Sequence, residues 1–429
     1  MDLLEQLGRL PLPFLARCRV PTDLAGVTSW GEEISAWDTG ADPKGVEVVW
    51  EAAEALYRTG ITPALQLCIR HRGEIVLDRT LGHLSGNAPG DDHRTPEVLA
   101  TPETPFCLFS SSKLITAMLI HKLDERGLVH LEDRVADYVP GFERHGKQWI
   151  TLRHLLAHRA GIPNLPPEAM DLELLGHPDT VAELICDMHP SSRAGRLVAY
   201  HAISGGFVLG EVVRQVTGKT IREFLAAEIC EPLGLRWMNY GVGEADLDKV
   251  AINARTGPPA PPGVAGLLRR ALGKSIDEVV ELSNDPRFLR GIIPAGNVVS
   301  NARELTTFLQ CLLNDGSVGD VRIFEPRTVR HALTEQSYRE IDLTLLMPLR
   351  YGLGPMLGDD PVGLFGPSTG RAFGHLGFSN IIPWADPARK ISVALLTSGK
   401  PIVSTHVVRL FQLLGAINSA FPRQDRPLD

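Results

Sequence analysis

The sequence lacks an excess of positive charge, a long apolar run and a basic leader. Its formal net charge is −8 over 429 residues, which gives no electrostatic basis for binding nucleic acid or an anionic membrane. No apolar stretch reaches the roughly 18 residues that a membrane-spanning helix requires. The start, MDLLEQLGRLPLP, has no basic region ahead of an apolar stretch. We therefore predict no secretory signal and expect a cytoplasmic location.

The six cysteines lack the spacing of a metal or redox site. None belongs to a C-x-x-C motif, and most lie within apolar periodic segments. Because free cysteine there behaves as a small apolar residue, we expect buried thiols in a reducing compartment. His154 and His158 are four residues apart, but no adjacent glutamate completes H-E-x-x-H, so both are expected to be structural. We predict no metal and no cofactor.

Apolar periodicity places strands near both ends of the chain and helices between them. Alternation around His71-Arg72-Gly73 predicts a β-hairpin, and residues 371–400 predict three consecutive strands. Helical periodicity occurs at 43–59, through most of 108–240, at 301–314 and at 405–421. We therefore expect an α/β sandwich with an inserted all-α subdomain. The expected α/β domain comprises 1–107 and 292–429, and the helical subdomain comprises 108–291.

Residues 255–282 form a separate feature of the helical part. The segment starts with a Pro/Gly-rich stretch and continues as an amphipathic stretch containing Leu267, Leu268 and Leu272. It could act as a lid over a site. A surface insertion packed on its neighbours is the favoured interpretation, because insertions at the surface are well tolerated.

The segment Ser110-Ser111-Ser112-Lys113 opens an apolar, helix-periodic run. Residues three apart share a helix face, so Lys113 is predicted to lie beside Ser110, and neither other serine has such a partner. A neutral lysine can remove the proton that makes a serine hydroxyl a weak nucleophile. A helix start also directs backbone N–H groups toward developing charge. Because serine is a common helix cap, this motif alone does not decide the function.

Further segments follow Ser110 in a fixed order, and together they resemble the serine β-lactamase and penicillin-binding-protein superfamily. The resemblance covers roughly residues 45–415 and is greatest to class C-like enzymes and family VIII carboxylesterases. It implies a β-lactamase-like sandwich of an antiparallel sheet covered by helices, with an inserted all-α subdomain. The segments are FSSSK, ITLRHLLAHRAGIP, AYHAISGGFVLGEVVRQVTGKTIREFL, EPLGLRWM, IPAGNVVSNARELTTFLQCLLNDG and FGHLGF.

The resemblance implies a catalytic role for three side chains. Ser110 would be the acylated nucleophile, and Lys113 would be its base or proton-shuttle partner. Tyr200 would exchange protons with Ser110 and the leaving group, and a cationic Lys113 is expected to lower the pKa of its phenol.

The same resemblance implies a binding strand beside the nucleophile. The backbone N–H groups of Ser110 and Phe378 would form the oxyanion hole. His375 and Gly377 would bind substrate, with Gly377 leaving room for it against the strand edge. We expect His375 to be partly charged at neutral pH.

Two departures from the family pattern favour esters over β-lactams. The Tyr motif reads Tyr200-His201-Ala202 and so lacks its asparagine, and His375-Leu376-Gly377 replaces K-T-G. Both changes weaken recognition of an anionic acyl-amide substrate and leave the nucleophile intact. We therefore predict a serine carboxylesterase or acyltransferase acting on small to medium acyl esters, with a small-molecule ester as its partner. The oligomeric state is not predicted.

Two alternatives remain open. One is a β-lactamase or D-amino-acid peptidase, and the other is a catalytically quiet binding protein of the same fold. Retention of Ser110, Lys113 and Tyr200 argues against the quiet protein.

A second serine motif is expected to be a decoy. Residues 366–370 match G-x-S-x-G around Ser368, a motif that requires a strand before it and a helix after it. The residues after Gly370 instead lead into a predicted strand, so Ser368 is not expected to be the nucleophile.

Overall fold

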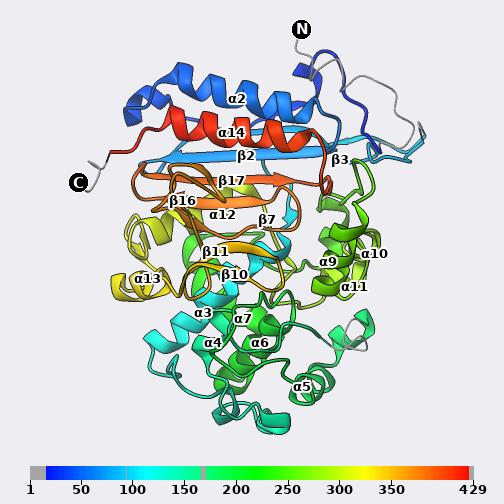
Figure 1. Cartoon of the computed structure of the whole chain (residues 1–429). Helices are drawn as coiled ribbons and strands as arrows, with labels where there is room; N and C mark the ends of the chain where they lie inside the picture. The colour runs from blue at the N-terminus through cyan, green and yellow to red at the C-terminus, as the bar shows by residue number, and fades with distance from the viewer. Residues whose placement is uncertain (1–15, 93, 166–170, 425–429) are drawn as a thin grey trace.

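A large antiparallel sheet forms the centre of the protein (Figure 1). The computed structural model describes residues 16–92, 94–165 and 171–424. The strand order is β1-β3-β2-β17-β16-β15-β12-β11-β10, with β4 beside β3. The predicted α/β fold, with an antiparallel sheet covered by helices, is confirmed. The strands are β1 (Thr28–Trp30), β2 (Ala64–His71), β3 (Glu74–Ser85), β4 (Val98–Leu99), β10 (Ser337–Asp342), β11 (Met347–Tyr351), β12 (Met356–Leu357), β15 (Phe373–Gly374), β16 (Ile382–Asp386) and β17 (Ile391–Thr397).

The predicted hairpin joins β2 and β3 and fixes their register beside the turn. His71 pairs with Glu74 across the two-residue turn Arg72-Gly73. Both turn residues have positive φ, 55° at Arg72 and 96° at Gly73. This backbone matches the twist of the paired strands, and glycine adopts it without steric cost. The short turn sets the pairing as far as Arg70 and Ile75, and a register shift between Ile69 and Arg70 changes it for the rest of the two strands.

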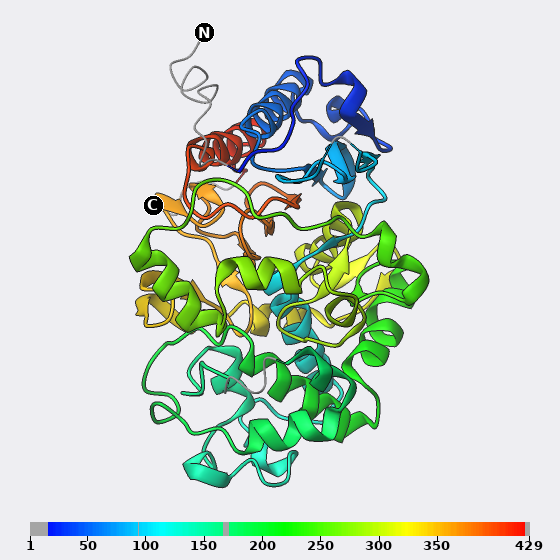
Figure 2. The ribbon, with the colours of Figure 1, turned by 90° about the vertical axis from the view of Figure 1, so that its right-hand side faces the viewer.

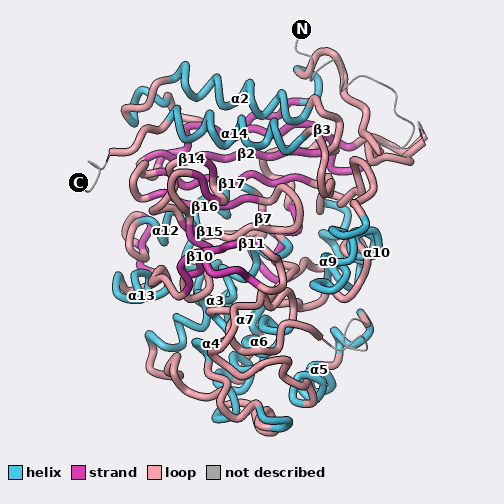
Figure 3. The backbone as a smooth tube through the Cα atoms, viewed as in Figure 1, coloured by secondary structure: helices cyan, strands magenta, loops and turns pink. Residues whose placement is uncertain are grey.

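Helices cover both faces of the sheet. Alternate residues of β17 point to opposite sides, so Val393 and Leu395 join one apolar core while Ala394 and Leu396 join the other. Helices α2 and α14 pack together over the first face, and α12 packs against the second. Figure 3 shows the strands gathered between these helices. The helices are α2 (Pro43–Tyr57), α12 (Ala302–Leu313) and α14 (His406–Ala420).

A group of helices lies below the sheet in Figure 1 and positions the start of α3. Nearly every residue of α3 is buried, because α6 and α13 pack against it. A small sheet of order β5-β7-β6 connects segments before, within and after the helical part. The expected domain boundaries remain a prediction. The elements are α3 (Ser112–Glu125), α4 (Leu152–Leu156), α5 (Pro178–Cys186), α6 (Ser204–Thr217), α7 (Ile221–Leu225), α8 (Glu231–Leu233), α13 (Pro326–Ala332), β5 (Phe106–Cys107), β6 (Asn239–Tyr240) and β7 (Val298–Ser300).

Three helices on one side of the molecule contain the segment 255–282 and its continuation. Figure 2 turns this side toward the viewer. The serine ahead of α10, Ser275, accepts a hydrogen bond from the Glu278 N–H, and the Glu278 side chain accepts one from the Ser275 N–H. This reciprocal cap fixes where α10 begins. The helices are α9 (Pro262–Leu272), α10 (Ile276–Leu282) and α11 (Pro286–Arg290).

The cysteines behave as the sequence predicts. All six are free and buried. Within the described ranges, no helix combines the length and apolarity needed to cross a membrane. The expectation of no leader at the start of the chain concerns residues 1–15, which lie outside the described residues.

Candidate active site

Ser110 lies in a 3₁₀ turn, Phe109–Ser111, directly ahead of α3. The preceding residue, Phe109, has φ 47°, a left-handed conformation that is unusual for a bulky residue and typical of strained functional turns. Ser111 Oγ donates to the His375 carbonyl over 2.8 Å, and Ser112 Oγ accepts from the Val298 N–H over 2.9 Å. Two of the three serines therefore attach the turn to neighbouring backbone. Ser110 remains half-buried and lines an apolar cavity.

Lys113 occupies the position that the helical spacing predicts. Its Nζ lies 3.1 Å from Ser110 Oγ and 3.0 Å from the Ala295 carbonyl oxygen. The side chain is buried, and this burial lowers the pKa of Lys113 to about 7, because desolvation disfavours the ammonium form. A substantial share of the neutral amine at neutral pH makes Lys113 able to accept the Ser110 proton.

Tyr200 approaches Ser110 from the loop before α6. Its hydroxyl forms a hydrogen bond with Ser110, and Lys113 Nζ lies 4.8 Å from the centre of its ring. Burial raises the pKa of Tyr200 well above its ordinary value; the hydrogen bond to Ser110 opposes this rise, and the nearby Asp342 carboxylate adds to it. The expectation that Lys113 lowers this pKa is therefore wrong. Burial is the largest cause of the raised pKa, so Tyr200 is a neutral phenol at neutral pH.

His375 differs from the sequence expectation in its charge. Its side chain is completely buried, and Nδ1 lies 2.8 Å from the Leu376 carbonyl oxygen. Burial, with a smaller contribution from Lys113, lowers the pKa of His375 to about 3. The imidazole is therefore neutral at pH 7, where partial charge was expected. Among the described residues, Leu376, Gly377 and Phe378 line the cavity and His375 does not, so this geometry gives no support to direct substrate binding by His375.

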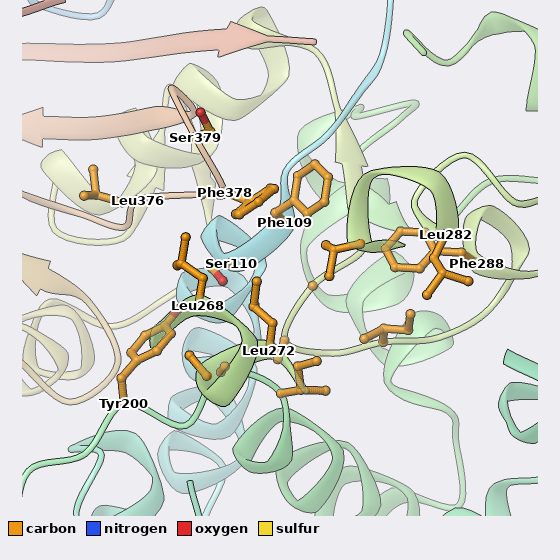
Figure 4. A pocket seen from close by; sticks show the side chains of 18 of the residues that line it. Phe109, Ser110, Tyr200, Leu268, Leu272, Leu282, Phe288, Leu376, Phe378 and Ser379 are labelled. Atoms are coloured by element: carbon orange, nitrogen blue, oxygen red, sulfur yellow. The ribbon is translucent and has the colours of Figure 1, made fainter. Parts of the chain in front are cut away.

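The segment after β15, which the sequence predicts as a strand, contains only an isolated bridge at Gly377, and it brings Gly377 and Phe378 to the cavity that Ser110 lines. A Cβ atom on Gly377 would lie 2.5 Å from the Leu108 carbonyl oxygen, so only glycine fits this close approach. The Gly377 N–H donates to Ile381 over 2.8 Å. The backbone N–H groups of Ser110 and Phe378 are the two that the family resemblance assigns to the oxyanion hole. The Phe378 ring packs beside Phe109, with ring centres 5.5 Å apart (Figure 4). An oxyanion hole formed by these two N–H groups remains our prediction.

Asp342, at the end of β10, is a positioning residue that the sequence analysis missed. Its carboxylate is fully buried and accepts a hydrogen bond from the Tyr200 N–H over 3.1 Å. The same oxygen accepts from the N–H groups of Thr344 and Leu345, and the other oxygen accepts from the Tyr351 hydroxyl. Asp342 thus fixes the backbone that presents Tyr200. An aspartate followed by a turn was visible in the sequence, but no local signal linked it to Tyr200.

The histidines near the site have structural roles, in a helix cap and in packing against Tyr200. His154 Nδ1 accepts from the Thr151 N–H over 3.1 Å as part of a helix cap. The His158 ring lies 4.8 Å from the Tyr200 ring, and its Nδ1 accepts from the His201 N–H. The described residues contain no group of three or more His, Cys, Asp or Glu side chains placed to hold a metal ion. The structural roles expected for His154 and His158 agree with these contacts.

An apolar cavity of about 330 Å³ opens at Ser110 (Figure 4). Asp171 is the only charged residue among the described residues that line it. Part of the wall comes from α9 and α10, through Leu268, Ala271, Leu272, Val279 and Leu282. The segment 255–282 therefore forms part of the cavity wall, and a role as a lid stays a prediction.

Ser368 lies away from this cavity in an exposed loop. It follows the two-residue strand β14 (Gly366–Pro367), and the next described element is β15, not a helix. Its context therefore differs from the strand and helix that a nucleophile elbow requires.

Comparison with known proteins places this site in a family. A profile described as Beta-lactamase matches residues 51–416. The chain belongs to the beta-lactamase family. A similar curated protein is the esterase/beta-lactamase LipL of Mycobacterium tuberculosis, which is 30% identical over 312 residues, covering 70% of each protein.

Two solved structures share the fold of this chain. A penicillin-binding protein homolog from Caulobacter crescentus is 25% identical with a TM-score of 0.72, over 89% of this chain and 99% of the homolog. A family VIII carboxylesterase has a TM-score of 0.73 at 24% identity, over 87% of this chain and 98% of the esterase. The family resemblance seen in the sequence is confirmed.

Proposed function

We propose that this member of the beta-lactamase family is a serine carboxylesterase that forms an acyl-enzyme on Ser110. The proposal rests on how Ser110, Lys113 and the apolar cavity are arranged. Ser110 Oγ lies 3.1 Å from a lysine amine whose pKa is about 7, and the serine opens onto a cavity lined almost entirely by apolar groups. The substrate class that fits is a small to medium acyl ester.

The geometry supports a proton path from Ser110 through Lys113 and Tyr200 to the leaving group. The neutral Lys113 amine accepts the Ser110 proton while Oγ bonds to the acyl carbon. Backbone N–H groups of Ser110 and Phe378 stabilise the oxyanion. Tyr200, as a neutral phenol, donates its proton to the departing alkoxide and regains one from the Lys113 ammonium. Water, or a second alcohol in acyl transfer, then attacks the acyl-enzyme as these proton transfers reverse.

The charge distribution supports esters over anionic amides. Ala202 lines the cavity where the family pattern has an amide side chain, and His375 is a buried neutral imidazole where the pattern has lysine. A substrate carboxylate would meet no positively charged side chain among the described lining residues. The name of LipL, an esterase/beta-lactamase, fits the ester proposal and also leaves the β-lactamase alternative to be tested.

The predicted cytoplasmic location remains a prediction. Six free buried thiols suit a reducing compartment.

We expect this protein to hydrolyse p-nitrophenyl butyrate with a kcat/KM at least about two decades above that for nitrocefin. One charged hydrogen bond contributes about 1.5–3 kcal/mol, roughly ten- to hundredfold, and two recognition groups are missing. Ala202→Asn should reduce the difference between the kcat/KM values for the two substrates. Steady-state kinetics on both substrates check this, and faster turnover of nitrocefin would establish the β-lactamase alternative.

Asp342→Ala should lower kcat for the ester by about tenfold or more, because a lost hydrogen bond to a charged group costs roughly 1.5–3 kcal/mol and releases the Tyr200 backbone. Asp342→Asn keeps an oxygen acceptor and should restore most of kcat. Measuring kcat and KM beside the melting temperature separates positioning from stability. A lower melting temperature with unchanged kcat would show that Asp342 is only structural.

A further inference from the structure

A second apolar cavity lies between α5 and α6 and borders the active-site cavity. Its volume is about 250 Å³. The two cavities share two lining residues, Leu175 and Phe207. Both side chains are only half-buried. The partition between the two cavities therefore includes side chains, which can change rotamer without a change in the backbone.

The chemistry of the second cavity suits an uncharged chain. Its walls are mainly apolar, with Val181, Ala182 and Ile185 from α5. Its charged lining residues are Glu211 and Arg214, which bind each other over 2.8 Å. Because this pair is already satisfied, the described lining offers no unpaired charge to an ionic ligand. Buried surface of this kind favours hydrocarbon.

We propose that the two cavities form one acyl site, in which the tail of a long-chain fatty acyl ester passes Leu175 and Phe207 into the second cavity. The proposal rests on the proposed esterase function and extends its acyl range. The acyl carbon would lie at Ser110, the first methylenes in the active-site cavity, and the distal methylenes between α5 and α6. Each methylene that leaves water strengthens binding roughly fourfold.

The position of the shared residues supports a continuous path. Phe207 lies in the first turn of α6, a few residues after Tyr200 and Ala202, which line the first cavity. The backbone segment 292–295 lies along both cavities, since Ile293 and Ala295 line the first while Ile292 and Pro294 line the second. A chain leaving Ser110 beside this segment would therefore meet Phe207 and Leu175 before it reached α5.

The test compares kcat/KM for p-nitrophenyl laurate with that for butyrate, using the full chain. Ala182→Phe places a ring in the second cavity, and Ala182→Leu is a smaller filling. If the new side chain keeps two or more methylenes of the laurate tail out of the second cavity, the laurate-to-butyrate ratio of kcat/KM should fall by at least about tenfold. Phe207→Ala widens the passage and should raise the ratio several-fold. Thr180→Phe, an exposed position on the same helix, is the matched control and should leave the ratio unchanged.

The outcomes separate this inference from the proposed function. An unchanged ratio in folded Ala182→Leu and Phe207→Ala proteins would overturn the shared acyl site, even if butyrate is hydrolysed through Ser110. A ratio that falls equally in Thr180→Phe would also overturn it. Absence of hydrolysis for every ester with the unaltered protein would instead refute the esterase function. Melting temperatures establish that each variant is folded.

Discussion

Ser110→Ala is expected to abolish covalent labelling by a fluorophosphonate probe and to lower kcat for ester hydrolysis by several decades. The substitution removes the hydroxyl oxygen that lies 3.1 Å from Lys113 Nζ and opens onto the cavity. Ser111 and Ser112 cannot replace it, because their hydroxyls are bonded to the His375 carbonyl and the Val298 N–H. The large loss reflects removal of the atom that would form the acyl bond.

Ser368→Ala is the matched control for this result. Ser368 lies in a G-x-S-x-G motif and is exposed, but the next described element is the strand β15 and not a helix. Its removal should leave labelling and kcat unchanged. Mass spectrometry of the labelled peptide identifies the modified serine directly. Labelling that persists in Ser110→Ala would refute the assignment of the nucleophile.

The sheet could be predicted where short-range patterns determine it. The β2–β3 hairpin follows from alternating apolar residues around a turn whose second residue is Gly73, with φ 96°. Strands β10 and β11 gave a weaker signal. Tyr338 and Ile341 on β10 are 63% exposed, so this sheet edge lacks the regular apolar alternation of a half-buried strand. Edge strands with both faces partly exposed to solvent are thus harder to assign from sequence.

Some site residues could likewise be predicted from local sequence patterns, whereas others are placed by contacts between distant parts of the chain. Lys113 follows from helical spacing alone, because residues three apart share a face. Tyr200 required the family resemblance, since nothing near it in the sequence indicates proximity to Ser110. Asp342 was missed because its hydrogen bond to Tyr200 joins residues 142 positions apart. Contacts of this separation depend on how the helical part packs on the sheet edge.

Both errors in the predicted protonation states have one physical origin. Lys113 was expected to lower the Tyr200 pKa, and His375 was expected to be partly charged. Sequence motifs indicate neighbouring charges, but they do not give the depth of burial. In the folded protein, desolvation is the largest contribution at both residues, and it favours the neutral form of each. The resulting site has a neutral phenol, a neutral imidazole and one titrating lysine beside the nucleophile.

The pH dependence of ester hydrolysis should report that lysine. Burial lowers the Lys113 pKa from 10.5 to about 7, so the amine is neutral above that pH and can act as base. We expect kcat/KM to rise with pH and to reach half of its plateau near pH 7, falling about tenfold per pH unit on the acid side. Lys113→Met should lose several decades of kcat, because methionine has no basic nitrogen.

Lys113→Met should raise the thermal stability of the protein although it lowers kcat, because the buried ammonium destabilises the folded state. The cost of the buried ammonium is fully present below the folded pKa of about 7 and disappears as pH rises toward the unfolded value of 10.5. Lys113→Met removes that cost, so its gain in melting temperature should be larger on the acid side of neutrality than at alkaline pH. Thermal unfolding at several pH values measures this difference.

Lys400 provides the decisive control for this assignment. It is also fully buried, its pKa is also lowered to about 7 by burial, and its Nζ lies 4.8 Å from the centre of the Phe109 ring. Its Nζ donates a hydrogen bond to the Thr397 carbonyl over 2.7 Å, whereas Lys113 Nζ lies 3.1 Å from Ser110 Oγ. In Lys400→Met, kcat/KM should therefore still fall on the acid side, with its half-maximum at the same pH as in the unaltered protein. If the limb disappears in Lys400→Met, the titrating group that controls hydrolysis is Lys400 and not Lys113.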